Sequence, residues 1–398
     1  MNLQRPTQTG ACAGNRRRPM VRRARFDLRA SPAAGEHAVS PDASRFAAGA
    51  AHVMAVAQQH DIDVTALTDA GTFTAKKLAD LQKLIRDKIG SDVPEGIDVV
   101  LCGSFGRQEL TPGSDCDFLI LVQSDVDADY ISQLRLHVRD AARELQLEPP
   151  GATGLFGDFA IATELYGRVG LDTDSYPNAT RRMLLITESV SALNPDVRRS
   201  TIDRILQRYC SDYGKQNTDQ VRNRVPRFFL NDLMRYWRTI TVDYAAKQWM
   251  DGREASHLRR VKLLTSRKIL FAGTFATGLT ASYLADDERR LSERIQEHIA
   301  SQCDQTPLDR LMALHEKLGS DGQAALVRVL RAYCSFVSCM ASEQDKSLIK
   351  NGFPDADHQS SNLRMRVEKI TDDIQEGLEQ IFFDDPYLAS LTRSFGLF

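Results

Sequence analysis

The sequence predicts an α+β fold, in which a small mixed-sheet domain is followed by an all-helical domain. Short runs of aliphatic and β-branched residues between positions 97 and 161 are typical of buried strands. After Thr180 the apolar residues recur at spacings of three and four, which indicates helices. A chain of 398 residues is long enough to form both domains.

Residues 1–42 are predicted to be a disordered basic tail. They are rich in Arg, Pro, Ala, Gly and Ser and show no apolar periodicity. Residues 1–30 alone contain eight arginines and one aspartate, so one interpretation is a basic arm that binds nucleic acid or an acidic partner. The alternatives are an unstructured tail and an over-extended start, with Met20 or Met54 as the true first residue.

Composition limits the classes of function. A net charge of −2 gives no general attraction to nucleic acid or to membranes, so DNA is not an expected partner. The seven cysteines form no CxxC pair, which argues against a zinc site or a disulfide framework and favours a cytoplasmic location. The uncharged stretch Ile269–Leu284 is short for a bilayer span and is predicted to be a buried helix, so we expect no membrane partner.

Residues 43–195 are expected to form the mixed-sheet domain. Its first helix is predicted at Ser44–Gln59, and Thr74 is predicted to cap the start of a second helix. The strands are expected at Ile97–Cys102, Asp117–Val122 and Gly154–Ile161, and the helix between the last two at Asp129–Leu147.

Residues 196–398 are expected to form the helical domain, and no fixed-period repeat is visible in them. The helices, including one that precedes this domain, are expected at Arg181–Ser191, Asp196–Tyr213, Arg227–Met250, Arg259–Leu284, Glu288–Cys303, Leu308–Leu318, Gln323–Ser342 and Ser361–Phe382.

The segment Leu101–Val122 contains the residues that are best suited to binding and catalysis. A strand ends at Cys102 and is followed by Gly103 and Ser104. Glycine lets the backbone approach a ligand closely, and a short helix starting at Phe105 would direct free N–H groups at an anion. Gly103 and Ser104 are therefore predicted to bind a phosphate.

Asp115 and Asp117 open the next predicted strand and lie two residues apart. Side chains at that spacing project to the same face of a strand. Two such carboxylates repel each other unless a cation lies between them, and hard oxygen ligands suit Mg²⁺ or Mn²⁺. We interpret the pair as a divalent-metal site, with a solvated acidic strand start as the alternative.

The pattern G-S-x-x-R-x-E-L-x-x-x-S-D-x-D, from Gly103 to Asp117, resembles the polymerase-β-like nucleotidyltransferase superfamily. Its GRxELxPxSDxD form is most similar to the PII-protein uridylyltransferase branch, and more loosely to the aminoglycoside nucleotidyltransferases. The sequence shows no HD phosphohydrolase domain and no paired regulatory domains, which argues against the nitrogen-sensing role of that branch.

The resemblance implies a role for each matching residue. Gly103 and Ser104 would bind the nucleotide triphosphate, and the catalytic residues Asp115 and Asp117 would bind Mg²⁺ or Mn²⁺. Ser114 would also bind nucleotide, by a hydrogen bond to a phosphate, or would cap the turn.

Two features of the pattern leave alternatives open. Arg107 would clamp a phosphate of the nucleotide, because its planar guanidinium suits one, or would pair with Glu109 to hold the loop. The superfamily also has a third carboxylate on a neighbouring strand. Asp158, Asp172 and Asp174 are the alternatives for it.

Cations of the later chain are further candidates for phosphate contacts. Arg181 and Arg182 follow a loop that is expected near the cleft, and Arg235 and Arg238 share one helix face. In each case an ion-paired or structural role is the alternative. The densest basic stretch, which would bind phosphate or an RNA acceptor or be structural, contains Arg259, Arg260, Lys262, Arg267 and Lys268.

The sequence therefore predicts a magnesium-dependent nucleotidyltransferase that transfers an NMP group from an NTP, such as ATP, to an acceptor hydroxyl or phosphate. The acceptor would be a protein, a small molecule or an RNA, and the motif variant favours a protein. The alternatives are a non-catalytic nucleotide-sensing module and a toxin or defence enzyme that modifies tRNA.

Overall fold

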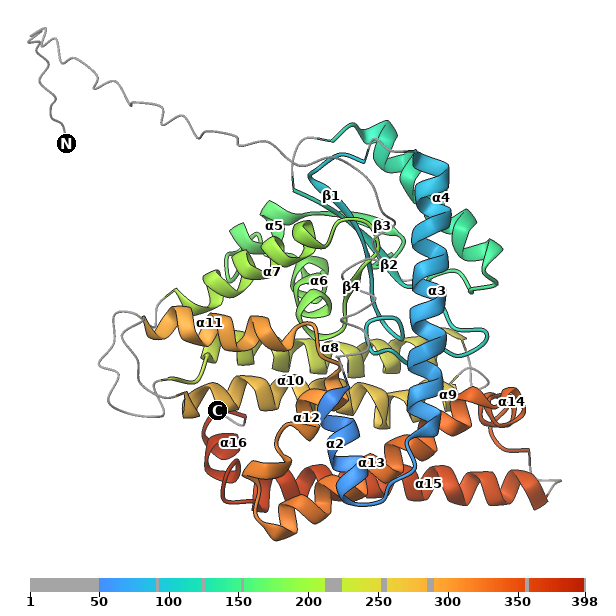
Figure 1. Cartoon of the computed structure of the whole chain (residues 1–398), viewed down its shortest axis with the longest axis vertical. Coiled ribbons are helices and arrows are strands. Elements are labelled where there is room, and N and C mark those ends of the chain that lie inside the picture. The colour runs from blue at the N-terminus through green and yellow to red at the C-terminus, as the bar shows by residue number, and fades with distance from the viewer. Residues whose placement is uncertain are drawn as a thin grey trace, which may run out of the picture. The chain divides into compact units, whose positions relative to one another are not determined.

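Two aliphatic runs form the centre of the sheet in the computed structural model (Figure 1). β1 (Ile97–Leu101) and β2 (Phe118–Val122) are fully buried and antiparallel. β3 (Asp158–Ile161) lies parallel to β2, and β4 (Val190–Ser191) lies antiparallel to β1. The resulting order β3-β2-β1-β4 confirms the predicted small mixed sheet.

The rest of the described chain is mostly helical, as expected. The structure describes residues 50–90, 93–123, 126–151, 154–211, 224–251, 256–284, 290–354 and 358–396. The α-helices are α2 (Ala51–Gln59), α3 (Thr65–Ile89), α4 (Ala128–Glu144), α5 (Ala162–Gly167), α6 (Tyr176–Thr187), α7 (Pro195–Cys210), α8 (Arg227–Asp251), α9 (Ser256–Leu264), α10 (Ser266–Thr280), α11 (Leu291–Gln302), α12 (Pro307–Met312), α13 (Ser320–Ala341), α14 (Glu343–Lys350), α15 (His358–Glu379) and α16 (Ala389–Phe395). The 3₁₀-helices are η2 (Ala281–Tyr283) and η3 (His315–Lys317), and η4 (Gln380–Asp384) is a π-helix.

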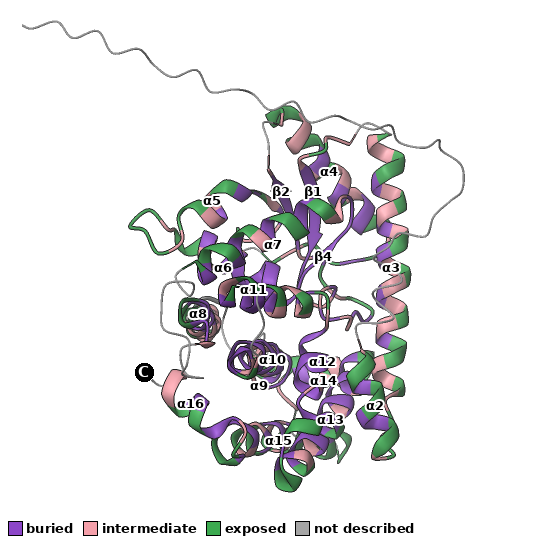
Figure 2. Cartoon of the chain, turned by 60° about the vertical axis from the view of Figure 1, so that its left-hand side comes forward, coloured by how far each residue is buried: buried purple, intermediate pink, exposed green. Residues whose placement is uncertain are grey.

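Alternate strand residues face two different layers, because successive side chains of a strand point to opposite faces. Val99 and Ile120 belong to an apolar cluster with α3 and α4. Val100 and Leu119 belong to a second cluster, which includes α6, α7 and the later helices. In Figure 2 the strands and the inner sides of these helices are buried, and the outer side of α3 is exposed. The second face of the sheet therefore looks toward the helical part of the chain.

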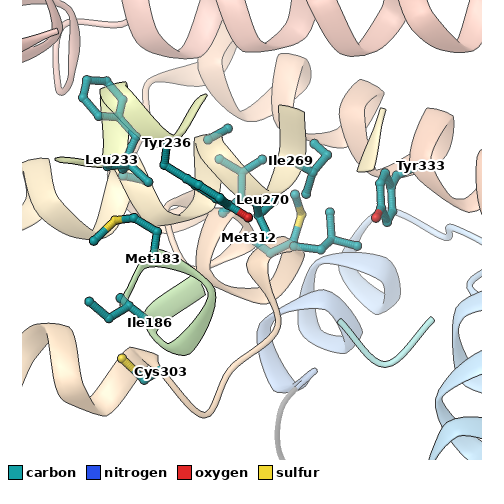
Figure 3. Packing of buried hydrophobic residues seen from close by; sticks show 14 of the residues in the cluster. Met183, Ile186, Leu233, Tyr236, Ile269, Leu270, Cys303, Met312 and Tyr333 are labelled. Carbon is teal, nitrogen blue, oxygen red and sulfur yellow. The ribbon is translucent and has the colours of Figure 1, made fainter. Parts of the chain in front are cut away.

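The second cluster continues from the sheet into the helices. Met183 of α6, Leu233 and Tyr236 of α8 and Leu270 of α10 pack together in Figure 3. The described residues, which begin at Ala50, all belong to one compact unit. The division at residue 195 into two domains stays a prediction, and the predicted tail at 1–42 lies outside the described residues.

Helix α3 joins the two layers, and its start corrects a prediction. It begins at Thr65, nine residues before Thr74, which is therefore not a capping residue. Thr74 is buried in the helix interior, where its hydroxyl donates to the Ala70 carbonyl and accepts from the Leu110 backbone N–H at 2.9 Å. Its polar side chain does not begin the helix but holds the loop that follows β1.

Several element boundaries differ from the predictions. The predicted helix Arg181–Ser191 stops at Thr187, and Val190–Ser191 forms β4. The third strand begins at Asp158 and not at Gly154. Helices α14 and α16 were not predicted. They are short, with eight and seven residues, and a short helix gives little periodic signal.

The predicted helix Arg259–Leu284 is two helices. It breaks at Thr265, whose φ of −120° and ψ of −94° are not helical. Ile269 and Leu270 of α10 are buried, so this apolar stretch is a buried helix as predicted. One described helix, α13, has the length and composition to cross a membrane, but 67% of its apolar window is buried inside the protein, as in a core helix.

Candidate active site

A tight loop follows the carboxyl-terminal end of β1, which is an inner strand of the sheet. Gly103 has a φ of +64°, a backbone conformation that glycine adopts without strain. The backbone N–H groups of Arg107 and Glu109 donate to the carbonyls of Gly103 and Ser104, at 3.1 and 2.9 Å. The loop is a series of turns, so the short helix expected from Phe105 is wrong.

Gly106 lets this loop pack directly on the end of α6. An added Cβ at Gly106 would lie 2.2 Å from the carbonyl oxygen of Glu188, which is well inside contact distance. A backbone atom cannot move aside as a flexible side chain can. The sequence pattern did not reveal this contact, because Glu188 lies far from Gly106 in the chain.

We expect Gly106→Ala to lower the free energy of unfolding by roughly 1–3 kcal/mol, because the methyl group overpacks the contact with Glu188. Urea unfolding of both proteins measures the difference. Gly71→Ala is the matched control. It lies in α3 with no atom near the added Cβ, so it should stabilise the protein by about 0.5–1 kcal/mol. Equal effects of the two substitutions would contradict the packing argument.

The second half of the loop leads to the two aspartates. Ser114 caps the turn, because its hydroxyl accepts from the Thr111 N–H at 3.0 Å. The Ser114 carbonyl and the Cys116 N–H then bond to the backbone of Glu148, in an isolated bridge formed by Asp115. Ser114 therefore caps the turn, which is one of the two roles expected for it.

Asp117 lies just before β2 and directly beside Gly103. A Cβ on Gly103 would lie 2.9 Å from Oδ2 of Asp117, so glycine leaves space next to this carboxylate oxygen. Burial, followed by the charge of Asp115, raises the pKa of Asp117 from 3.8 to about 6. A carboxylate held beside a second negative charge, with free space at its oxygen, fits a divalent cation.

Arg107 is held by two carboxylates. Its Nε donates to Glu109 at 3.0 Å, and its Nη1 bonds to the fully buried Glu188. Arg267 of α10 also pairs with Glu188, at 2.7 Å, and the Tyr333 hydroxyl donates to Glu109. The ion pair between Arg107 and Glu109 was one of the two predicted alternatives. The nucleotide-binding role of Arg107 stays a prediction.

All six predicted site residues line one cavity, which we call the Asp115 recess. Those six are Gly103, Ser104, Arg107, Ser114, Asp115 and Asp117. The helical part of the chain completes the recess with Lys262, Ser266, Arg267, Phe336, Val337, Met340 and Lys346. The two halves of the chain thus meet at this cavity.

Lys262 and Arg267 line the recess, although the sequence placed them only within a general basic stretch. The break at Thr265 separates α9 from α10 and brings both cations to the recess. Ser266 and Arg267 begin α10, and the first turn of a helix favours an anion. Within the described ranges the ammonium group of Lys262 makes no hydrogen bond or ion pair. Its side chain reaches solvent, although the surrounding protein lowers its pKa.

Lys346 of the unpredicted helix α14 holds the loop between Gly103 and Asp117. Its ammonium group donates to the carbonyl of Pro112 at 2.8 Å and to that of Gly113 at 3.4 Å. Two backbone carbonyls do not neutralise its charge. The recess therefore has two aspartates on one wall and cations on the other, as the binding of a metal–polyphosphate complex requires.

The candidates for the third carboxylate differ in their surroundings. Asp158 pairs with Leu119 in the register of β2 and β3, but it does not line the Asp115 recess. Its carboxylate is 3.7 Å from Arg135. Asp174 is engaged by buried Arg182, and Asp172 is exposed. Among the described residues, no three His, Cys, Asp or Glu side chains form a metal-binding group.

The other predicted arginines do not line the recess. Arg182 is fully buried between Asp174 and Asp232, at 2.7 and 3.0 Å, so it cannot contact a phosphate. Arg235 pairs with Asp232, and Arg238 lines a different cavity. For Arg182 and Arg235 the structural alternative is therefore correct.

Comparison with known proteins agrees with the motif. Residues 82–150, which include the whole loop and both aspartates, match the family of the nucleotidyltransferase domain. No curated protein matches the chain.

Proposed function

We propose that this chain, which contains a nucleotidyltransferase domain of the polymerase-β-like superfamily, transfers an NMP group from an NTP to an acceptor at the Asp115 recess. The observation that supports this most strongly is the composition of the recess. Asp115 and Asp117 face Lys262, Arg267 and Lys346, which come from the other half of the chain. Such a pairing suits a substrate that combines a cation with a polyphosphate.

Asp115 and Asp117 would hold Mg²⁺ or Mn²⁺, with Asp158 as the proposed third carboxylate because it begins β3, the strand directly beside β2. Such an ion, when bound, neutralises phosphate charge in the transition state. Gly103 and Ser104 would bind the triphosphate through the loop backbone and the serine hydroxyl.

The acceptor oxygen forms a bond to the α-phosphorus, and the bond from that phosphorus to the β-phosphate oxygen breaks. Pyrophosphate leaves with the electron pair of the broken bond. Lys262 and Arg267 would stabilise its charge. The acceptor's proton passes to a carboxylate of the site or to solvent.

We propose a protein acceptor, because the motif is closest to the protein-modifying branch. The six described cysteines are free and buried, which supports a reducing compartment such as the cytoplasm. The test incubates the full chain with each α-labelled NTP and a cell lysate, and follows label into protein, RNA and small molecules. Label in RNA would identify a tRNA-modifying enzyme, and label in small molecules would also exclude the protein acceptor.

The double variant Asp115→Asn, Asp117→Asn should lose this transfer while staying folded. The matched control is Asp69→Asn, Asp87→Asn, which makes the same change of charge at exposed positions of α3. If the site variant keeps full activity, the assignment is wrong. Metal-independent NTP binding without pyrophosphate release by the unsubstituted chain would identify a nucleotide sensor.

We expect Lys262→Met to raise the KM for NTP by roughly tenfold, because one charge-assisted contact to phosphate is worth about 1.5 kcal/mol. Steady-state kinetics measure this. Arg260→Met is the control, since Arg260 lies on the same helix, is exposed and does not line the recess. Equal KM values for the two variants would remove Lys262 from the nucleotide site.

A further inference from the structure

A second cavity, which we call the aromatic pocket, lies between α8, α10, α15, η4 and α16. Its volume is about 360 Å³, within the range of small-molecule sites. Trp237, Phe271, Phe275 and Phe382 form a continuous wall with ring centroids 5.4–5.6 Å apart. Phe382 belongs to the π-helix η4, a geometry that is frequent at functional sites.

Two positively charged side chains, Lys268 and Arg238, line the pocket beside this aromatic wall. The ammonium group of Lys268 is half-buried and donates to the amide oxygen of Gln375, and burial lowers its pKa. Glu379 is the acid of the pocket lining, and its carboxylate accepts from the Gln375 amide nitrogen. Arg238 has no ion-pair partner in the described part of the chain. The lining therefore carries two positive charges against one negative charge.

We propose that the aromatic pocket binds an amphipathic carboxylate, with the apolar body against the aromatic wall and the carboxylate on Lys268 and Arg238. Glu379 and Asp372 act electrostatically on Lys268, whereas Arg238 has no such partner in the described part of the chain. An uncharged ligand would leave the net positive charge of the lining uncompensated, and a cationic ligand would be repelled. A mainly apolar cavity with a few polar groups to orient the ligand is the usual form of a small-molecule site.

The pocket lies next to the Asp115 recess along α10. Lys268 follows Arg267 directly, so the first turn of one helix contributes to both cavities. The binding proposal itself does not depend on the proposed function, because it is tested without any nucleotide.

The fluorescence of Trp237, which lines the pocket, can be used to measure ligand binding. The chain has two tryptophans, and Trp249 is 84% exposed, so Trp249→Phe leaves Trp237 as the sole tryptophan reporter. Decanoate, titrated below its micellar concentration into the full chain, should change the Trp237 emission saturably. We expect decyltrimethylammonium to bind at least tenfold more weakly, because it lacks the charge-assisted contact.

Two variants of the same reporter chain complete the test. Lys268→Met should weaken decanoate binding by roughly tenfold, whereas Lys268→Arg should keep most of the affinity. Ala272→Phe should fill the pocket and abolish binding. A non-saturating signal, equal affinities for the anionic and cationic probes, or unchanged binding to folded Lys268→Met protein would each overturn the proposal.

Discussion

Asp117→Asn is expected to make the metal-free protein more stable and to remove the proposed nucleotidyl transfer. The pKa of Asp117 is about 6 where an ordinary aspartate has 3.8, so ionisation of this carboxyl disfavours the folded state by at most roughly 3 kcal/mol. Asparagine carries no charge and avoids that cost. Removing one fixed electrostatic group of an active site costs about 10²–10³ in kcat, and we expect at least this loss.

The stability cost of ionising Asp117 depends on pH in a direction that follows from its raised pKa. Below pH 3.8 the carboxyl is protonated in both states and costs nothing. Between 3.8 and about 6 the folded protein binds the extra proton, so the stability of the unsubstituted protein falls as the pH rises. Above about 6 the full cost remains. The gain in stability of Asp117→Asn should therefore develop across this window.

Urea unfolding of the metal-free proteins at pH 5 and pH 8 measures this gain. Magnesium should stabilise the unsubstituted protein at the higher pH and much less at the lower, because the metal competes with the proton. It should have little effect on Asp117→Asn. A variant that is less stable than the unsubstituted protein at the higher pH would show that burial and the charge of Asp115 do not disfavour the ionised Asp117 carboxylate in the folded state.

The motif and the strands could be predicted because they are local in the sequence. The aliphatic runs of β1 and β2 bracket a loop whose glycine, serine and aspartates have a fixed spacing. In the fold, Oδ2 of Asp117 lies on the side of Gly103 where a Cβ would be in any other residue. For the same reason the mixed sheet was predictable, since its central strands carry a strong apolar signal.

The other wall of the site could not be predicted, because it depends on contacts between distant segments. Lys262 and Arg267 looked alike within one basic stretch, and the break at Thr265 decides where they lie. Arg182 looked like a phosphate contact, but its carboxylate partners lie up to 50 residues away in the chain. A pattern of charges does not show which of them are buried in pairs.

Glu188→Gln is expected to lower the free energy of unfolding by roughly 3–5 kcal/mol, the cost of breaking a buried ion pair from one side. Glu188 is fully buried. Burial alone would raise its pKa, but Arg267 and Arg107 lower it below the ordinary value, so the folded protein depends on its negative charge. Its loss leaves Arg267 without a carboxylate partner among the described residues and Arg107 with Glu109 alone. Urea unfolding at neutral pH measures the cost.

Two comparisons separate this cost from a general effect of losing a carboxylate. Glu144→Gln breaks a half-exposed pair with Lys88 and should change stability by no more than about 0.5 kcal/mol. The double variant Glu188→Gln, Arg267→Gln removes one charge of each sign, so it should be more stable than Glu188→Gln alone. If the double variant is the less stable of the two, Arg267 is not held by Glu188. The recess would then need a different account of how α10 presents a cation to the two aspartates.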